Sequence, residues 1–194
     1  MNIPVQLIVF SIPAWITLFV RKRRGEKYQV VMRDIGWQGC ALRYYLLGLL
    51  LLVILGLLGW MAMRFVPVSV LHQPGLSFFA YAGSQVTLIT FLGILLHEAI
   101  YVALGEEIFF RGWLGGWLFR KFGFALGNVI QAVFFLLPHL LLLSVSTALY
   151  PILLVQLLAG WLLGWLRYQS GSILPGWVVH SLTNALSVML MMAR

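Results

Sequence analysis

Apolar runs close to twenty residues or longer recur along this chain of 194 residues, and they constrain its fold more than any other feature. About 20 apolar residues in a helix span the hydrocarbon core of a bilayer. Only 9% of the residues are charged, whereas a soluble surface carries roughly 25–35%. In lipid, helices bond every backbone polar group within one segment. The chain is therefore predicted to be all-α, a polytopic integral membrane helical bundle.

About six spans are expected, and no polar linker divides them, so residues 1–194 are predicted to form a single integral membrane domain. The stretch Glu26–Leu42 mixes charged and apolar side chains and is expected to lie on the membrane surface as an amphipathic helix. Because its basic residues follow the first apolar run, we interpret that run as a retained helix and not as a signal peptide. The expected spans are Asn2–Val20, Tyr45–Met63, Phe79–Gly105 continuing toward Lys121, Phe124–Leu143, Thr147–Leu166 and Ile173–Met192.

Positive charge gathers in the loops that this topology places on one side, namely Arg21–Arg43, Arg120 with Lys121, and Arg167. The positive-inside rule makes this side cytoplasmic and puts both termini on the other face. Basic loops beside spanning helices set topology and meet anionic lipid more often than they bind nucleic acid. We therefore expect the lipid bilayer as a partner, no nucleic acid, and a multi-pass location in the cytoplasmic membrane of a prokaryote.

Two adjacent glutamates, Glu106 and Glu107, interrupt the third apolar segment, and Arg111 follows one helical turn later. An ionisable group in a membrane segment costs about 2.5–3.5 kcal/mol on insertion scales, so its default interpretation is functional. Glu107 and Arg111 have the spacing of a helical ion pair, which leaves Glu106 without an obvious partner. A buried, unpaired carboxylate binds a proton more readily than an exposed one and suits a general base. The alternative for the pair is a structural ion-pair cluster between helices.

His139 adds an ionisable group to another apolar segment. A lone histidine on an apolar helix is more often a packing residue than a catalyst. Its depth nevertheless favours a shared site. With a turn near Gly123, Glu106 lies 17 residues before the turn and His139 lies 16 after it, so an antiparallel hairpin places both at about the same depth. Pro138, directly before the histidine, is expected to loosen the helix there.

His180 and Asn184 form a polar pair in the last apolar segment. They are four residues apart and share one helix face. Both can donate hydrogen bonds and would suit an oxyanion that develops at a scissile carbonyl. The alternative is a polar seam that packs helices together. Counted from a turn near Ser170, His180 is expected to lie nearer the cytoplasmic face than His139.

The three motifs EExxxR, FxxxH and HxxxN, in this order, resemble the CAAX-protease and bacteriocin-processing family of glutamic-type intramembrane endopeptidases, which includes the Ras-converting prenyl-protein endopeptidases. The resemblance covers about Leu92–Met189, and it extends to Phe110-Arg111-Gly112 and to Ser170-Gly171-Ser172-Ile173-Leu174. It implies roles for six residues. Glu106 would activate water with help from His139, Glu107 and Arg111 would support it, and His180 and Asn184 would polarise the substrate carbonyl.

Metal chemistry is the alternative to a glutamate-activated water. The one His-Glu pair, His97-Glu98, has Tyr101 in place of the second histidine of an HExxH motif, and we assign it no family role. It is expected to line a water path, to pair internally or to sit at a membrane interface. We favour a site with no metal and no cofactor. The zinc alternative would use three ligands, Glu106, His139 and His180.

The leading hypothesis from these motifs is an intramembrane endopeptidase that hydrolyses a peptide bond in a membrane-anchored protein or peptide. The expected substrates are C-terminal sorting tails, bacteriocin leaders or CAAX-like ends. Two alternatives come from other classes of protein. One is a non-catalytic membrane scaffold of the same fold. The other is a proton-coupled transporter, although transporters usually carry paired repeats and none is found here.

Overall fold

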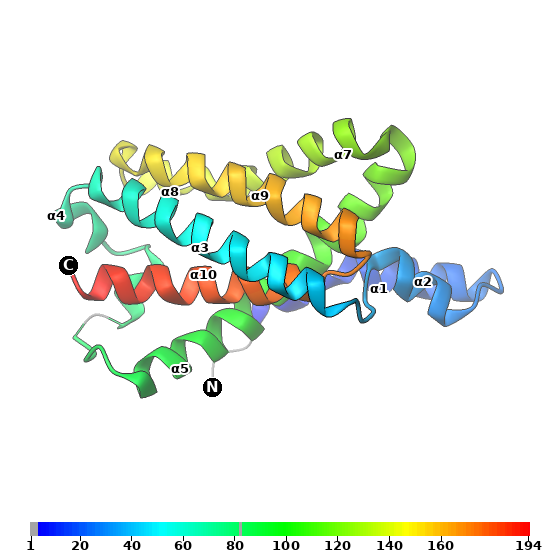
Figure 1. Ribbon diagram of the computed structural model, residues 1–194, viewed down its shortest axis with the longest axis horizontal. Helices are drawn as coiled ribbons and strands as arrows, with labels where there is room; N and C mark the ends of the chain where they lie inside the picture. The colour runs from blue at the N-terminus through cyan, green and yellow to red at the C-terminus, as the bar shows by residue number, and fades with distance from the viewer. Residues whose placement is uncertain (1–3, 82) are drawn as a thin grey trace.

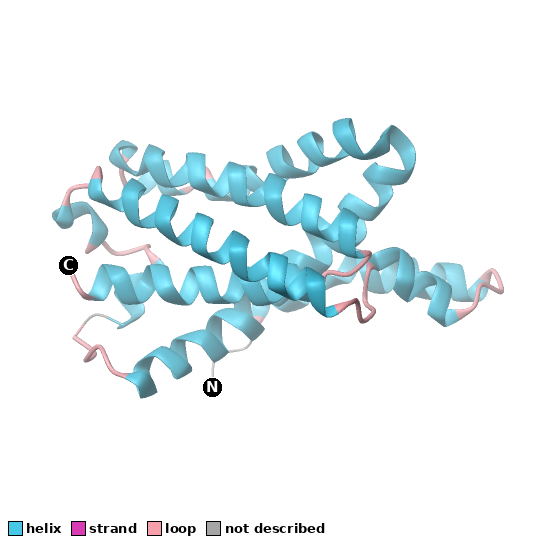
Figure 2. Ribbon diagram, in the orientation of Figure 1, coloured by secondary structure: helices cyan, strands magenta, loops and turns pink. Residues whose placement is uncertain are grey.

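The computed structural model describes residues 4–81 and 83–194, and within these residues the chain is helical with no strand (Figures 1 and 2). This confirms the all-α fold. The α-helices are α1 (Val5–Arg23), α2 (Tyr28–Ile35), α3 (Leu42–Arg64), α4 (Val68–Leu71), α5 (Leu88–His97), α6 (Leu104–Glu106), α7 (Gly116–His139), α8 (Leu142–Val145), α9 (Tyr150–Ser170) and α10 (Leu174–Met192). Two wider π-helical segments are η2 (Glu98–Ala103) and η3 (Glu107–Gly115), and two short 3-10 segments are η1 (Ser77–Tyr81) and η4 (Thr147–Leu149).

Four stretches of the described residues are long and apolar enough to cross a membrane: Val5–Arg23, Leu42–Arg64, Leu88–Val145 and Thr147–Ser170. The third has 58 residues and reverses direction at Gly123, where φ is 73° and ψ is 170° (Figure 1). That region of backbone space is open essentially to glycine alone, which explains why the turn falls there. The stretch therefore supplies two antiparallel arms. The chain is a multi-pass membrane protein.

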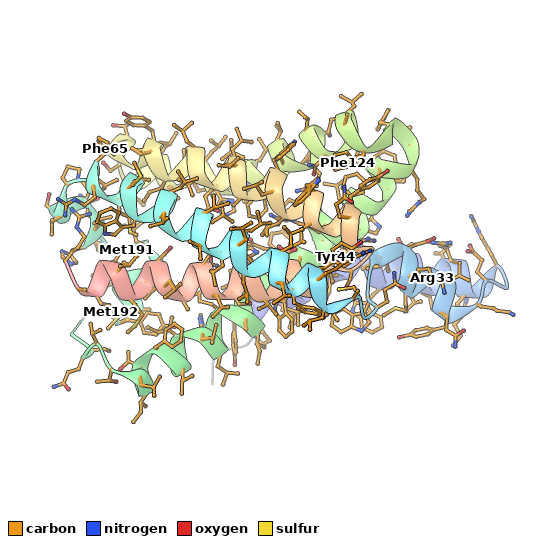
Figure 3. All side chains as sticks on the ribbon, in the orientation of Figure 1. Arg33, Tyr44, Phe65, Phe124, Met191 and Met192 are labelled. Carbon is orange, nitrogen blue, oxygen red and sulfur yellow. The ribbon has the colours of Figure 1, made fainter. Side chains whose placement is uncertain are left out.

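The outer surface of the bundle is apolar, as contact with lipid requires. Many large apolar side chains are exposed, and four that are more than two-thirds exposed are Leu42, Leu88, Ile89 and Leu141. The bundle also has two chemically distinct ends. Figure 3 shows Arg33 at the end that carries most basic residues, and Phe65 and Met191 at the opposite end.

Two elements differ in extent from the sequence-based expectation. The surface helix α2 ends at Ile35 and not at Leu42, because Gly36 adopts a left-handed C-cap with φ of 78°. The third span begins at Leu88 and not at Phe79, because the Thr87 side chain caps α5 by accepting a hydrogen bond from the backbone N–H of Thr90.

The expected span Phe124–Leu143 is also shorter in the structure. α7 ends at His139, and the backbone N–H of Leu141 bonds to the carbonyl of Pro138, three residues earlier, at 3.3 Å. Pro138 lacks an N–H, so the last turn of α7 has one backbone hydrogen bond fewer, and the chain leaves the expected span four residues early. This break places His139 at the helix end, next to the interior of the bundle.

Small residues let the central helices approach closely. A Cβ added at Gly160 of α9 would lie 3.0 Å from the Phe135 ring of α7, and one at Gly48 of α3 would lie 3.1 Å from Val179 of α10. Such contacts are typical of helix packing in membranes, where dispersion rather than water exclusion drives association. The result is a packed frame of α3, α7, α9 and α10 around the polar residues of the third span.

Candidate active site

The glutamate motif lies where the third span departs from regular α-helix. η2 and η3 flank the single α-helical turn α6, and π-helical turns occur often at functional sites. The segment is held on two sides. Gly105 lies directly against α1, because an added Cβ would be 2.8 Å from the Leu7 Cα. On the other side the Trp177 indole N–H of α10 donates to the Ala99 carbonyl at 2.8 Å.

Glu106 is buried, with 5% of its surface exposed, and its two oxygens have different environments. Oε1 accepts a hydrogen bond from Nε2 of Gln6 at 2.5 Å. Oε2 has no hydrogen-bond partner among the described residues. The expectation that Glu106 lacks a partner is thus wrong for one oxygen, because α1 folds back against α6 and brings Gln6 to it. The other oxygen is left for a proton or a small polar molecule.

Glu107 and Arg111 form the ion pair that their spacing predicts. Both side chains are fully buried, and Nη1 of Arg111 lies 3.2 Å from Oε1 of Glu107. The guanidinium also lies over the Phe135 ring, 3.9 Å from its centroid, which stabilises a desolvated cation. The geometry gives α7 a direct contact with the charged centre of η3.

His180 lies between the two glutamates. Its Nδ1 is 2.9 Å from Oε1 of Glu107, and since a carboxylate only accepts, this nitrogen donates. Its Nε2 is 3.5 Å from Oε2 of Glu106. The carboxylates of Glu106 and Glu107 point in different directions because they are adjacent on a helix, but the two nitrogens of the His180 ring lie close to both of them. α10 thus packs directly on the glutamate segment. The expectation that His180 lies nearer the cytoplasmic face than His139 stays a prediction.

His139 also belongs to the site, and a hydrogen bond to its own helix fixes its tautomer. Its Nδ1 lies 2.8 Å from the carbonyl of Phe135, and a carbonyl can only accept, so Nδ1 carries the proton. In the neutral imidazole Nε2 then holds a lone pair. The ring also packs on Phe135, with centroids 4.6 Å apart. His139 therefore has a hydrogen-bond acceptor at Nε2, and it lines the same cavity as Glu106.

A cavity of about 500 Å³ joins these residues. Its wall includes Glu106, His139, His180 and Asn184, so the structure brings all four candidate catalytic residues to one space. Most of the remaining wall is apolar. Examples are Leu55, Leu71, Leu76, Leu142, Ile152 and Val188. The cavity thus has a polar region at the glutamates and an apolar remainder.

Asn184 makes a contact that its motif did not predict. Its Nδ2 donates to Oε2 of Glu98 at 3.1 Å, and the Glu98 side chain is buried and also lines the cavity. Oε1 of Glu98 lies 3.6 Å from Nδ1 of His97, whose ring stacks on Tyr101 with centroids 4.9 Å apart. The His97-Glu98 pair therefore adjoins the site.

The donor set of the zinc alternative is not assembled in the part of the chain that the structure describes. No group of three or more histidine, cysteine, aspartate or glutamate side chains there could hold a metal ion. Both ring nitrogens of His180 face carboxylates, and Nδ1 of His139 is engaged by a backbone carbonyl.

Sequence reasoning missed two contributors to the site. One is Gln6, whose only signal was an amide in an otherwise apolar first segment. The other is Glu98 as the partner of Asn184, a contact between segments 86 residues apart in the chain. Neither can be inferred from spacing within a single helix.

Of three comparisons with known proteins, one finds a match. No curated protein and no solved structure gives a significant match to the chain. A family model described as type II CAAX prenyl endopeptidase Rce1-like matches residues 86–186, slightly more than half of the chain, and this range includes every site residue except Gln6. The chain belongs to this Rce1-like family of CAAX-type membrane proteases.

Proposed function

We propose that this protein is a metal-independent intramembrane endopeptidase in which Glu106 is the general base. The observation that carries the proposal is the buried Oε2 of Glu106, which has no hydrogen-bond partner among the described residues, in a residue that lines the same cavity as His139. A water bound there would meet the carboxylate and the lone pair of His139 Nε2. Gln6 holds the other oxygen of Glu106 and so fixes the direction of the carboxylate.

The charge of the buried cluster suits proton transfer from this water. Glu106 and Glu107 carry two formal negative charges, and Arg111 carries one positive charge, so the cluster with neutral histidines has a net charge of −1. A buried site favours the neutral state, because charge is costly in low dielectric. Glu106 takes one proton from water, which neutralises its carboxylate and passes the negative charge to a hydroxide in the same cavity, and this hydroxide attacks the scissile carbonyl carbon.

The same geometry provides for the rest of the reaction. The carbonyl oxygen becomes an oxyanion, and Asn184 Nδ2 and, when it bears a proton, His180 Nε2 are the donors that would stabilise it. The C–N bond then breaks, and the departing nitrogen receives the proton held by Glu106. Glu107 fixes the orientation of His180 through Nδ1, and Arg111 neutralises Glu107.

The two regions of the cavity support a proposal for the substrate class. A peptide bond would bind in the polar region, and a long hydrophobic group next to it would bind against the apolar remainder. We propose that substrates are membrane-anchored proteins or peptides, cleaved at a C-terminal sorting tail, a bacteriocin leader or a CAAX-like end, in the cytoplasmic membrane of a prokaryote.

The test is cleavage by the purified protein in detergent and in liposomes. Candidate tail peptides, with and without an attached lipid, are incubated with wild-type protein and with Glu106→Gln, and new termini are identified by mass spectrometry. The amide keeps the size of Glu106 but cannot take a proton, so we expect cleavage by wild type only. Glu26→Gln, which alters a glutamate at the basic end of the bundle, is the matched control and should remain active.

Two outcomes would contradict the proposal. Turnover by Glu106→Gln at the wild-type rate would remove Glu106 as the base. Absence of cleavage of every lipidated and unlipidated tail by folded wild-type protein would favour the non-catalytic scaffold.

A further inference from the structure

Glu98 is a buried carboxylate that the three motifs of the site do not explain. It is 3% exposed and belongs to an apolar stretch that is long enough to cross a membrane. An ionisable group in this position is costly and is retained where it has a function or a partner. Of the five acidic residues in the chain, only Glu98, Glu106 and Glu107 are buried, and Glu98 shares the cavity wall with Glu106.

The hydrogen bond of Glu98 is directed at the candidate oxyanion donor. Oε2 accepts from Asn184 Nδ2 at 3.1 Å, whereas the 3.6 Å between Oε1 and Nδ1 of His97 is too long for a hydrogen bond. The hydrogen-bond partner of Glu98 is therefore Asn184 and not His97.

The chemistry of the amide gives this bond a consequence. A carboxylate accepts hydrogen bonds and cannot donate them, whereas the asparagine side chain has an accepting end and a donating end. If the amide of Asn184 turned over, its oxygen would face an oxygen of Glu98, and the contact would be repulsive. Glu98 therefore fixes the orientation of the amide in which its nitrogen, and not its oxygen, faces the carboxylate. That nitrogen has two hydrogens. One is hydrogen-bonded to Glu98, and the second is free to donate to another group.

A second contact holds this arrangement in place. Ala99, the neighbour of Glu98, accepts a hydrogen bond from the Trp177 indole N–H at 2.8 Å. Trp177 and Asn184 both belong to α10, seven residues apart, and so lie on the same face of that helix. η2 and α10 are thus joined at two points, which restricts the sliding or rotation that would separate Glu98 from Asn184.

We propose that Glu98 is a positioning residue of the peptidase site, which orients the amide of Asn184 so that its free N–H faces the cavity where the scissile carbonyl binds. The inference rests on the proposed function. It gives Glu98 no contact with the substrate, and its effect on catalysis passes entirely through Asn184.

The first test is a double-mutant cycle measured as turnover per folded molecule. Glu98→Ala should lower kcat roughly 10–100-fold with little change in KM, the size of effect seen when groups that orient functional ligands are removed. Glu98→Gln keeps an oxygen that can accept from Asn184 and should restore most of the rate. In the background of Asn184→Ala, Glu98→Ala should have no further effect on kcat, because the residue it orients is gone.

Asn128→Ala is the matched control for the asparagine. Asn128 is fully buried and donates to the Trp161 carbonyl between α7 and α9, away from the site. Its loss should lower the thermal stability and leave kcat unchanged. Additive effects of Glu98→Ala and Asn184→Ala, or a loss of stability without a loss of kcat in Glu98→Ala, would overturn the positioning role.

The second test does not depend on cleavage. The chain has three asparagines, so labelling with ¹⁵N-asparagine gives three side-chain amide signals, and the one absent in Asn184→Ala is assigned. In wild type the two protons of this amide should have clearly different chemical shifts, because one is bonded to a carboxylate, and they should converge in Glu98→Ala. Unchanged shifts would overturn the proposal. If the wild-type protein cleaves no substrate but the two shifts still converge in Glu98→Ala, the proposed function is contradicted, whereas the orientation of Asn184 by Glu98 is supported.

Discussion

Removing the carboxylate of Glu107 should destabilise the protein as well as inactivate it. Oε1 of Glu107 contacts Nη1 of Arg111 and Nδ1 of His180, and both charged side chains are fully buried. Loss of one member of a buried ion pair typically costs about 3–5 kcal/mol, because the other charge is left uncompensated. The Phe135 ring lies beneath the guanidinium in wild type and variant alike, so the uncompensated cation keeps this contact. We therefore expect the lower end of the range, about 3 kcal/mol, for Glu107→Leu.

The measurement is thermal unfolding followed by circular dichroism in one detergent at a fixed protein concentration. For a chain of this size each kcal/mol shifts Tm by about 2–4 °C, so Glu107→Leu should lower Tm by about 6–12 °C. Glu26→Gln is the control at the basic end of the bundle. It breaks the pair between Arg21 and Glu26, whose side chains are 23% and 36% exposed, and should leave Tm close to the wild-type value, because exposed ion pairs contribute little to stability.

A second variant separates the stranded charge from general damage to packing. Glu107→Leu combined with Arg111→Met replaces the whole pair by apolar side chains of similar volume, an exchange that is often neutral or stabilising. The double variant should regain most of the lost Tm and remain inactive, because His180 has lost its acceptor. If its Tm falls by the sum of the single losses, or if Glu107→Leu alone unfolds like wild type, the buried-pair argument is refuted.

Three further predictions concern the chemistry and the frame of the site. Asn184→Ala should lower kcat by roughly a hundred- to a thousandfold with little change in substrate binding, as loss of an oxyanion donor does; a fall in stability with intact turnover per folded molecule would contradict this. Activity should survive exhaustive chelation without stoichiometric zinc in elemental analysis, whereas loss on chelation and recovery with zinc would reverse the mechanism. Gly105→Val should displace α1, since even a Cβ would lie 2.8 Å from the Leu7 backbone, and should lower kcat and Tm together; wild-type kinetics would show that α1 does not support Glu106.

Properties that depend on residues near in sequence could be predicted from the chain alone. The all-α class follows from hydropathy, and the ion pair of Glu107 and Arg111 follows from their separation by one turn. The shared site of Glu106 and His139 was predicted from a turn at Gly123, because two segments of equal length on either side of a reversal reach equal depth. Each of these inferences needs only helix geometry and one turn.

Properties that depend on how separate helices pack could not be predicted. The hydrogen bond from Gln6 to Glu106 spans 100 residues, and the position of His180 between two carboxylates depends on the close approach of α10. Gly176 suits that approach, since a Cβ there would lie 3.0 Å from Oε2 of Glu107. Counting residues from a turn gives no information on such contacts between helices.

The contribution of α1 shows that the site extends beyond the part of the chain that defines the family. The match covers residues 86–186, and Gln6 lies outside it. Yet, among the residues that the structure describes, Gln6 supplies the one hydrogen bond to the Glu106 carboxylate, and the indole N–H of Trp113 in η3 donates to Thr17 of α1 at 2.9 Å. Because a general base must be held in direction as well as buried, a fragment restricted to the matched residues would retain every motif and lack the group that orients its base. The sequence before residue 86 is therefore a part of the proposed catalytic machinery and not only a membrane anchor.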